Sequence, residues 1–148
     1  MKRFIILPAA AIAKAGLALL FLIAPMISEA QVNYAPVRQP LNTGQWEFRQ
    51  ANTPTWKPVR IPVSAHTALL QNGMIEDPFW RDNEEKLQWI EKEDWEFQTT
   101  FSVGLEVLEK RHVELIFKGL DTYAQIYLND SLLLETDNMF RTWRVDAK

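Results

Sequence analysis

Nine residues near the middle of the chain alternate in a way that defines a β-strand with one buried face. Residues 95–103 read WEFQTTFSV, so Trp95, Phe97 and Phe101 fall on one side and polar residues fall on the other. Successive side chains of a strand point to opposite faces, and this period of two is typical of a sheet that covers a core with one side. The rest of the chain must then supply partner strands and a cover for that apolar face.

Further strand signals lie on both sides of this segment. Period-two alternation or short apolar runs occur at residues 45–49, 113–117, 123–128, 132–134 and 143–146. Asn129 and Asp130 close a predicted hairpin, because both residue types tolerate the positive φ of a tight turn. The predicted fold class is all-β, an antiparallel sandwich of about seven short strands.

One helix signal interrupts the strands, at residues 64–72. Ser64 can cap the free N–H groups, Leu69 and Leu70 supply an apolar face, and Gly73 can take a left-handed exit. Residues 77–94 then form a long polar and aromatic stretch, and long loops of this kind are uncommon unless they are functional.

The first 30 residues have the organisation of a secretory signal peptide. Its parts are the cations Lys2, Arg3 and Lys14, the apolar residues 15–27 and the small residues Ser28 and Ala30. The apolar run is shorter than the roughly 20 residues that span a bilayer. We expect cleavage after Ala30, an exported product that is periplasmic or extracellular, and no stable membrane span. An uncleaved N-terminal anchor is the alternative.

The composition of the chain limits the classes of partner that it can bind. The chain of 148 residues has no cysteine, a net charge of −3 and six tryptophans. Loss of residues 1–30 would remove three cations and one anion. An acidic chain without a basic stripe argues against nucleic acid as a partner. Without disulfides, an exported domain of this size must be stabilised by its core.

The sequence lacks the motifs on which most catalytic chemistries depend. His66 and His112 are far apart in sequence and no cysteine can complete a ligand set, so we expect no metal and no cofactor. His66 is better explained by packing or capping. There is no G-x-S-x-G elbow and no glycine-rich phosphate loop. The acidic residues between positions 84 and 94 are expected to be solvated charges of the loop.

Residues 77–83, DPFWRDN, carry the chemistry best suited to a sugar. An indole covers the C–H face of a pyranose, while Arg, Asp and Asn offer paired hydrogen bonds to neighbouring hydroxyls. The alternative is that Phe79 and Trp80 anchor the loop in the core and the polar residues cap it. Residue types alone leave both open.

Five motifs in order resemble a known family. They are DPFWRDNE at residues 77–84, WI at 89–90, EDWEF at 93–97, GLDTYA at 119–124 and DNMFR at 137–141. Together they resemble the N-terminal sugar-binding domain of β-mannosidases in glycoside hydrolase family 2, over residues 41–148. The family commonly has Asn-Gly where this chain has Asn129 and Asp130, a departure expected to cost a little turn stability.

The resemblance implies a galactose-binding-like jelly roll, incomplete at its C-terminus. In the family an immunoglobulin-like domain and a (β/α)₈ barrel follow, and the barrel carries both catalytic glutamates of a retaining mechanism. No catalytic residue is therefore expected in this chain. The expected organisation is a signal peptide at residues 1–30, an entry arm at 31–40 and a partial sugar-binding domain at 41–148.

The resemblance also implies substrate-binding residues. Asn83 is expected to contribute an amide to recognition of a sugar hydroxyl, with Arg81 and Asp82 beside it and Trp80 either stacking or anchoring. The expected function is that of the N-terminal part of an exported exo-β-mannosidase, inactive alone, whose substrate is an oligosaccharide with terminal β-mannose. A carbohydrate-binding module for mannosides and a purely structural brace for the barrel are the alternatives.

Overall fold

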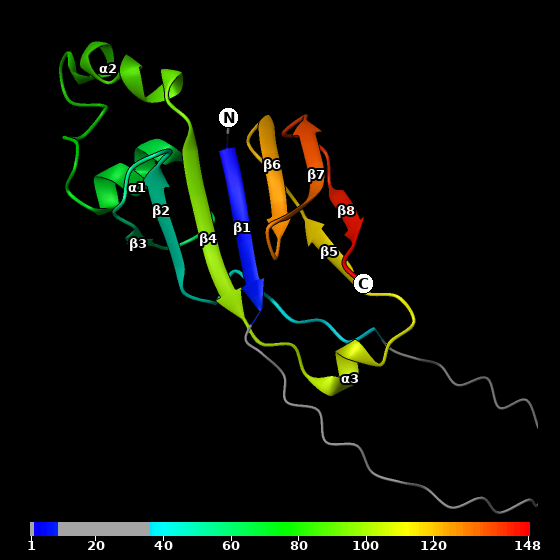
Figure 1. Cartoon of the computed structure of the whole chain (residues 1–148). Helices are drawn as coiled ribbons and strands as arrows, with labels where there is room; N and C mark the ends of the chain where they lie inside the picture. The colour runs from blue at the N-terminus through cyan, green and yellow to red at the C-terminus, as the bar shows by residue number, and fades with distance from the viewer. Residues whose placement is uncertain (1, 9–35) are drawn as a thin grey trace, which may run out of the picture.

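The computed structural model describes residues 2–8 and 36–148 (Figure 1). The strands are β1 (Lys2–Pro8), β2 (Trp46–Gln50), β3 (Lys57–Val59), β4 (Trp95–Phe101), β5 (Glu114–Phe117), β6 (Tyr123–Leu128), β7 (Ser131–Asp137) and β8 (Trp143–Asp146). The helices are α1 (Ala65–Gln71), α2 (Asn83–Lys86), α3 (Leu105–Leu108) and the 3₁₀ helix η1 (Gln88–Lys92). The predicted mostly-β architecture is confirmed.

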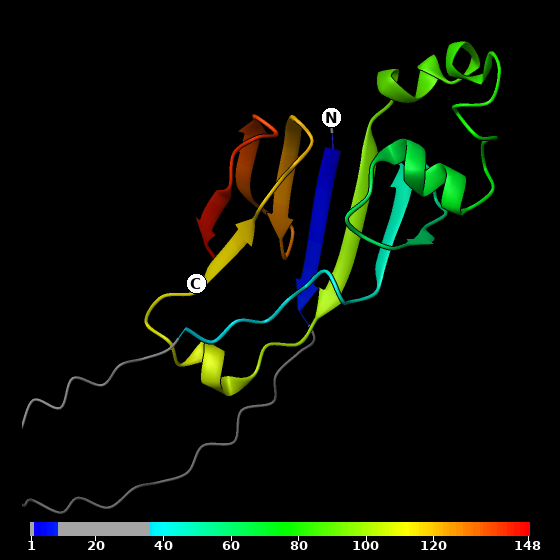
Figure 2. The ribbon, with the colours of Figure 1, turned by 180° about the vertical axis from the view of Figure 1, so that it is seen from behind.

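The strands form two sheets. The larger has six strands in the order β3-β2-β4-β1-β6-β7, and the smaller pairs β5 with β8. The ladders β2/β3, β2/β4, β6/β7 and β5/β8 are antiparallel, whereas β1 runs parallel to both of its neighbours. In the view from behind, α1 and β5 lie in front of the large sheet (Figure 2). The arrangement is thus layered, with one face of the large sheet covered.

Two hydrophobic clusters, counted over the residues whose burial is described, lie on either side of β1. The larger joins β2, β3, β4, α1 and η1 through Trp46, Phe48, Val59, Ala65, Ala68, Leu69, Leu87, Ile90, Trp95 and Phe97. Its centre is Phe48, whose ring stacks at 6.2 Å from Trp95 and 6.0 Å from Phe97. The smaller comprises Leu120, Ala124 and Ile126, with Phe117, Leu134 and Trp143 packed against it.

The strand predicted at residues 95–103 is confirmed as β4, which ends at Phe101, and Trp95, Phe97 and Thr99 form its expected buried face; Glu96 on the other face is the exception. Glu96 is 6% exposed, as deeply buried as its apolar neighbours. The Glu96 carboxylate lies beside its register partner Arg49, whose Nε donates to it at 2.6 Å and whose guanidinium lies over the Trp56 ring. The Glu96 carboxylate is therefore paired with Arg49, whereas the alternation predicted that it would face water.

The hairpin is confirmed together with its turn. Asn129 and Asp130 both have positive φ, 52° and 61°, the conformation of a two-residue turn that fits twisted strands. The second strand, β7, extends to Asp137 and is longer than the predicted 132–134. The strands expected near residues 45–49, 113–117 and 143–146 are confirmed as β2, β5 and β8.

The predicted helix is confirmed as α1. The Oγ of Ser64 accepts the N–H of Thr67 at 3.2 Å, and Gly73 exits with φ of +62°. The expected apolar face is partly wrong, because Leu70 is 41% exposed while Leu69 is buried. The alanines of α1 at positions 65 and 68 fill the contact with the sheet instead.

Several elements carry no clear sequence signal. The three-residue edge strand β3 and the single-turn helices α2 and α3 are too short to show a period. Residues 36–40 of the expected entry arm have no regular structure, and Gln39 donates to the carbonyl of Ser102 at 2.9 Å.

Part of the expected signal peptide falls within the described residues. Lys2–Pro8 forms β1, while its remaining residues and the start of the entry arm lie outside them. Within the described residues, no helix combines the length and apolar character needed to cross a membrane.

Candidate functional site

The long polar stretch between α1 and β4 folds as a compact excursion. Helices α2 and η1 occupy half of residues 77–94, and the pair sits beyond the end of the sheet where β4 begins (Figure 1). Leu87 and Ile90 are buried and tie this excursion to the larger hydrophobic cluster. Leu87 and Ile90 therefore anchor one side of the excursion to the larger hydrophobic cluster. Its other side is open to a ligand or a neighbouring domain.

A hydrogen-bonded turn builds the tip of the excursion. The Oδ1 of Asp77 accepts the N–H of Phe79 at 2.9 Å, and the carbonyl of Asp77 accepts the N–H of Trp80 at 3.1 Å. Arg81 has φ of 54°, an uncommon conformation for a non-glycine residue. The chain therefore reverses within a few residues, and the rings at its apex point outward.

The two apical rings are exposed. Phe79 is 96% and Trp80 62% exposed. The guanidinium carbon of Arg81 lies 5.7 Å from the centre of the Trp80 ring, within the range of a cation–π contact. The anchoring alternative is wrong in this structure for both rings, because neither is packed into the core.

Asn83 faces the other way. It is 4% exposed, and its Nδ2 donates to the carbonyl of Asp77 at 3.0 Å. Its Oδ1 accepts a long hydrogen bond of 3.4 Å from the Nζ of Lys86. The amide that was expected to meet a sugar thus closes the turn that carries Trp80 and Arg81.

Asp82 precedes α2 without capping it. Its Oδ1 accepts from the Nζ of Lys86 at 3.0 Å, and both side chains are largely exposed. The hydrogen bond from Lys86 lowers the pKa of the Asp82 carboxyl, assisted by the residue's own backbone N–H and by the charge of Lys86. Asp82 therefore presents an anion at the base of the tip.

The four predicted site residues are thus consecutive but divided in orientation. Trp80 and Arg81 form an exposed pair, Asp82 pairs with Lys86, and Asn83 is an internal brace. A stacking ring beside a cationic fork and a carboxylate can contact a pyranose through both its C–H face and its hydroxyls.

A hollow that residue types did not reveal lies beneath this tip. Its volume is about 280 Å³. The lining side chains come from α1 and the excursion: His66, Pro78, Glu84, Leu87, Gln88 and Glu91. Among the described residues, no group of three His, Cys, Asp or Glu side chains is arranged to hold a metal ion. Glu84 and Glu91 were expected to be solvated charges of the loop, so the residue types gave no signal for this hollow.

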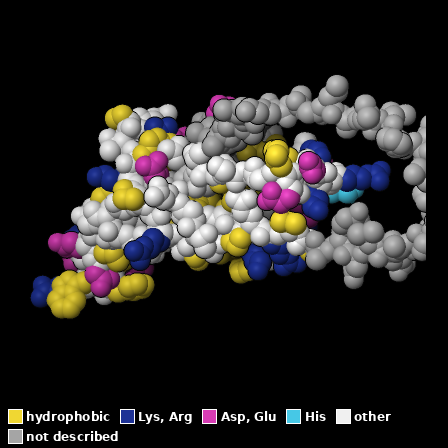
Figure 3. Space-filling model, turned by 90° about the horizontal axis from the view of Figure 1, so that it is seen from below, with side chains coloured by type: hydrophobic (Ala, Val, Ile, Leu, Met, Phe, Trp, Pro, Cys, Tyr) yellow, Lys and Arg dark blue, Asp and Glu magenta, His cyan; other side chains and the backbone are white. Residues whose placement is uncertain are grey.

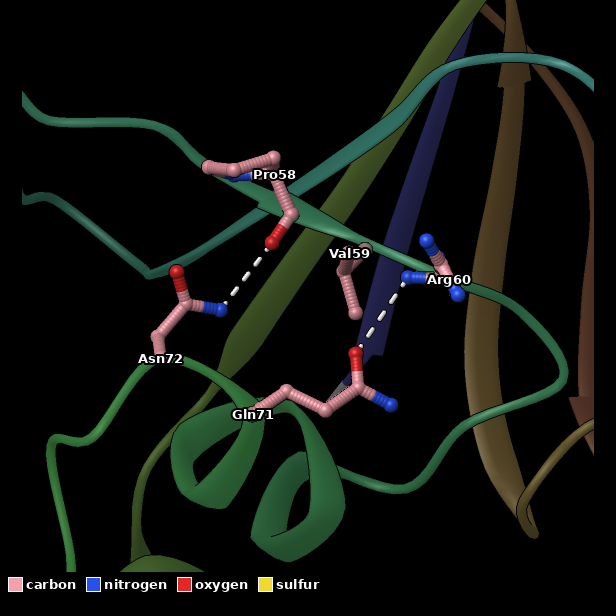
Figure 4. A pocket seen from close by; sticks show the side chains of 5 residues that line it. All are labelled: Pro58, Val59, Arg60, Gln71 and Asn72. Carbon is pink, nitrogen blue, oxygen red and sulfur yellow. Dashed lines mark hydrogen bonds between the residues drawn. The ribbon is translucent and has the colours of Figure 1, made fainter.

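A larger, more open hollow of about 490 Å³ lies at the sheet edge between β3 and the end of α1 (Figure 4). The Nδ2 of Asn72 donates to the carbonyl of Pro58 at 3.0 Å, and the N–H of Arg60 donates to the Oε1 of Gln71 at 3.4 Å. These bonds occupy backbone groups of the edge strand, which an open edge would offer to another chain. The hollow is thus explained by edge protection.

Figure 3 shows acidic and basic side chains interspersed over the face seen from below, with apolar side chains between them. That face offers no single-sign patch of the kind that binds nucleic acid.

Comparison with known proteins identifies the family. Residues 46–148 match the family described as the glycosyl hydrolase 2 galactose-binding domain-like domain. The chain belongs to this family. The domain is 36% identical over 104 residues to the β-mannosidase of Rattus norvegicus, a match that covers 70% of this chain and 12% of that protein.

Two further relatives agree. The domain is 41% identical over 105 residues to β-mannosidase B of Thermothelomyces thermophilus, covering 69% of this chain and 12% of that protein. The crystal structure of the β-D-mannosidase from Dictyoglomus thermophilum superposes with a TM-score of 0.68 at 43% identity, covering 70% of this chain and 13% of that one. The resemblance drawn from the five motifs is confirmed, and the chain spans about an eighth of the length of these relatives.

Proposed function

We propose that this chain is the N-terminal sugar-binding domain of an exported exo-β-mannosidase, which removes terminal non-reducing β-D-mannose from oligosaccharides with retention. Its similarity to β-mannosidases of a mammal, a fungus and a bacterium supports the proposal. The domain has a galactose-binding-like jelly roll and works with immunoglobulin-like and barrel domains of the same longer polypeptide. Both catalytic glutamates belong to that barrel.

The observation that carries the role of this domain is the exposed pair of Trp80 and Arg81 at the apex of the excursion. A ring that is 62% exposed gains by covering the C–H face of a sugar or an apolar wall of the barrel. Arg81 offers a planar set of donors beside the ring. We assign these two residues to direct contact at the rim of the substrate pocket.

Asn83 and Asp82 act at the base of this contact. Asn83 fixes the reversal through the carbonyl of Asp77, so it is a positioning residue in the domain as it stands. Asp82 supplies an exposed carboxylate that can accept from sugar hydroxyls. The four residues therefore form one substrate-binding unit, with no metal or cofactor in the proposed mechanism.

Hydrolysis of 4-nitrophenyl β-D-mannopyranoside by the full-length protein tests the assignment. Trp80→Ala is expected to raise KM several-fold, because an unoccupied stacking site forfeits about 1 kcal/mol or more of binding. Phe140→Ala is the matched control, since Phe140 is an aromatic ring as exposed as Phe79 but lies outside the excursion. Equal kinetics for the wild type and the Trp80 variant would leave the domain only a bracing role.

The isolated domain supplies a second test. Residues 31–148 are expected to show no turnover of the same substrate and no saturable heat on titration with mannobiose. Saturable binding by the domain alone would favour an independent carbohydrate-binding module. Turnover by the domain alone would overturn the proposal outright.

Export is tested separately. After expression of the unmodified coding sequence in a bacterial host, the mass of the protein in the periplasm and the medium should correspond to a chain that begins at Gln31. A chain that retains Met1 in the membrane fraction would favour the uncleaved anchor instead.

A further inference from the structure

Asn72 and Gly73 form the only Asn-Gly sequence of the chain, and they lie where α1 ends. In such a pair the backbone nitrogen of the glycine can attack the side-chain amide of the asparagine, because glycine has no side chain to obstruct the approach. Asparagine is a thermolabile residue for this reason, and a following glycine is its most reactive context. Whether the reaction proceeds in a folded protein depends on how the fold holds the two groups.

Hydrogen bonds engage both reacting groups in the structure. The Nδ2 of Asn72 donates to the carbonyl of Pro58 on β3 and to the carbonyl of Ala68 on α1, both at 3.0 Å. Figure 4 shows the first of these bonds. The N–H of Gly73 donates to the carbonyl of Leu70, also at 3.0 Å. The amide of Asn72 and the nitrogen of Gly73 must leave these partners before one can attack the other.

The pair is restrained by these hydrogen bonds and not by steric cover. Gly73 has φ of +62°, and a Cβ placed on it would meet no atom within 4 Å. Asn72 lines the open hollow of about 490 Å³ between β3 and the end of α1. Water therefore reaches the pair, and the closed contact between α1 and β3 is what protects it.

We propose that Asn72 is a self-modification site: opening of the contact between α1 and β3 allows it to deamidate, and the product keeps this contact open. In the first step the backbone nitrogen of Gly73 loses its proton and bonds to the Cγ of Asn72, and the side-chain nitrogen leaves as ammonia. Water then opens the cyclic imide at either of its two carbonyls, which gives aspartate or isoaspartate. Water is the only co-reactant.

The product cannot restore the contact. Asn72 meets the carbonyls of Pro58 and Ala68 as a donor, whereas a carboxylate can only accept and would face two carbonyl oxygens. Both carbonyls lose their donor, and a negative charge is added beside them. The end of α1 therefore loses this hold on β3, which lies at the edge of the large sheet. A molecule that has opened here once is changed permanently.

The donor role of Asn72 allows a test with a matched control. Asn72→Asp reproduces the product, whereas Gln71→Glu adds the same charge one residue earlier. The Oε1 of Gln71 accepts the N–H of Arg60, and a carboxylate oxygen can accept this bond as well. Amide hydrogen exchange of residues 57–60 in the full-length protein is expected to quicken at least about tenfold in Asn72→Asp and to stay near the wild-type rate in Gln71→Glu. Unchanged exchange in Asn72→Asp, or an equal increase in both variants, would overturn the proposal.

Peptide mapping by mass spectrometry follows the deamidation itself. The full-length protein is incubated in mildly alkaline buffer, with and without urea at a concentration that unfolds it. Position 72 is expected to convert at least about tenfold faster in urea, because folding closes the contact that restrains it. Asn42, which is exposed and followed by a threonine, is an internal control and should convert slowly in both solutions. Conversion at position 72 that is no faster in urea than in buffer would contradict the protection.

Loosening β3 alone tests whether local opening controls the reaction. Val59 is 7% exposed and belongs to the larger hydrophobic cluster, so Val59→Ala should weaken the hold on β3 without touching the reacting pair. Ile126→Val is the matched control, because it shortens a buried strand residue of the smaller cluster. In buffer, position 72 is expected to convert several-fold faster in Val59→Ala than in Ile126→Val. If Val59→Ala converts no faster than Ile126→Val, the proposal is overturned. None of these experiments measures turnover, so their outcome is independent of the proposed function.

Discussion

Arg49 on β2 and Glu96 on β4 form an ion pair inside the sheet, with Nε of Arg49 2.6 Å from Oε2 of Glu96. The two residues are register partners, and the Glu96 side chain is 8% exposed. Arg49 is held from two further sides, because its Nη1 donates to the carbonyl of Thr53 at 2.9 Å and its guanidinium lies 4.3 Å from the Trp56 ring. The pair satisfies a buried carboxylate that an apolar neighbour could not.

Removal of one partner should therefore be costly. Glu96→Ala is expected to lower the free energy of unfolding by about 3 kcal/mol, because it leaves Arg49 partly buried without its counter-charge. Urea unfolding followed by tryptophan fluorescence measures the change.

Glu114→Ala is the matched control. Glu114 also pairs across strands with an arginine, Arg144, at 3.1 Å, but both side chains are at least half exposed. An exposed pair contributes less than about 1 kcal/mol. Equal losses for the two variants would show that burial does not decide the worth of the Glu96 pair.

This pair also marks the limit of prediction from the sequence. Alternation located β2, β4 and β6, because the side-chain period of a strand is a local property. It could not show that Glu96 would be buried, since that depends on what covers the second side of β4. The same limit applies to Leu70, which was expected on the apolar face with Leu69, although Ala65 and Ala68 are the other buried residues of α1.

The candidate site shows the same division between residue type and geometry. The residues 77–83 were recognisable as sugar-binding chemistry and as a family motif, and the structure does bring Trp80 beside Arg81. The inward direction of Asn83 was not predictable, because it follows from a reversal in which Arg81 adopts a positive φ. Arginine does not favour a positive φ, so the residue type at position 81 does not predict this turn.

The hairpin turn between β6 and β7 should be improvable. Asp130 has φ of 61°, a conformation that costs a non-glycine residue about 1 kcal/mol and glycine nothing. Asp130→Gly is therefore expected to raise the free energy of unfolding by about 0.5 to 1 kcal/mol. Ser131→Gly, in the adjoining strand, should lower it by a similar amount, and an increase for both variants would contradict the turn assignment.

The carboxyl of Asp82 should titrate below the ordinary aspartate pKa. Lys86 favours its ionised form in the folded protein, so this contact stabilises the fold above the unfolded pKa of about 3.9 and is lost as the pH falls through the lower folded pKa. Carboxyl ¹³C NMR measures the titration. Lys86→Met should return the Asp82 pKa toward the ordinary value, whereas Lys92→Met, on η1, should not move it.

A single buried hydroxyl joins the two strands of the β6/β7 hairpin. Thr136 is 6% exposed, its Oγ1 accepts the N–H of Ala124 at 3.1 Å, and it donates to the carbonyl of Thr122 at 3.1 Å. Thr136→Val keeps the shape and removes both bonds, so the free energy of unfolding should fall by about 1 to 3 kcal/mol. Thr100→Val, at an exposed position of β4, should change it by less than about 0.5 kcal/mol. If thermal unfolding at several urea concentrations showed no difference between the two variants, the hydroxyl would be dispensable and the smaller hydrophobic cluster alone would hold this hairpin.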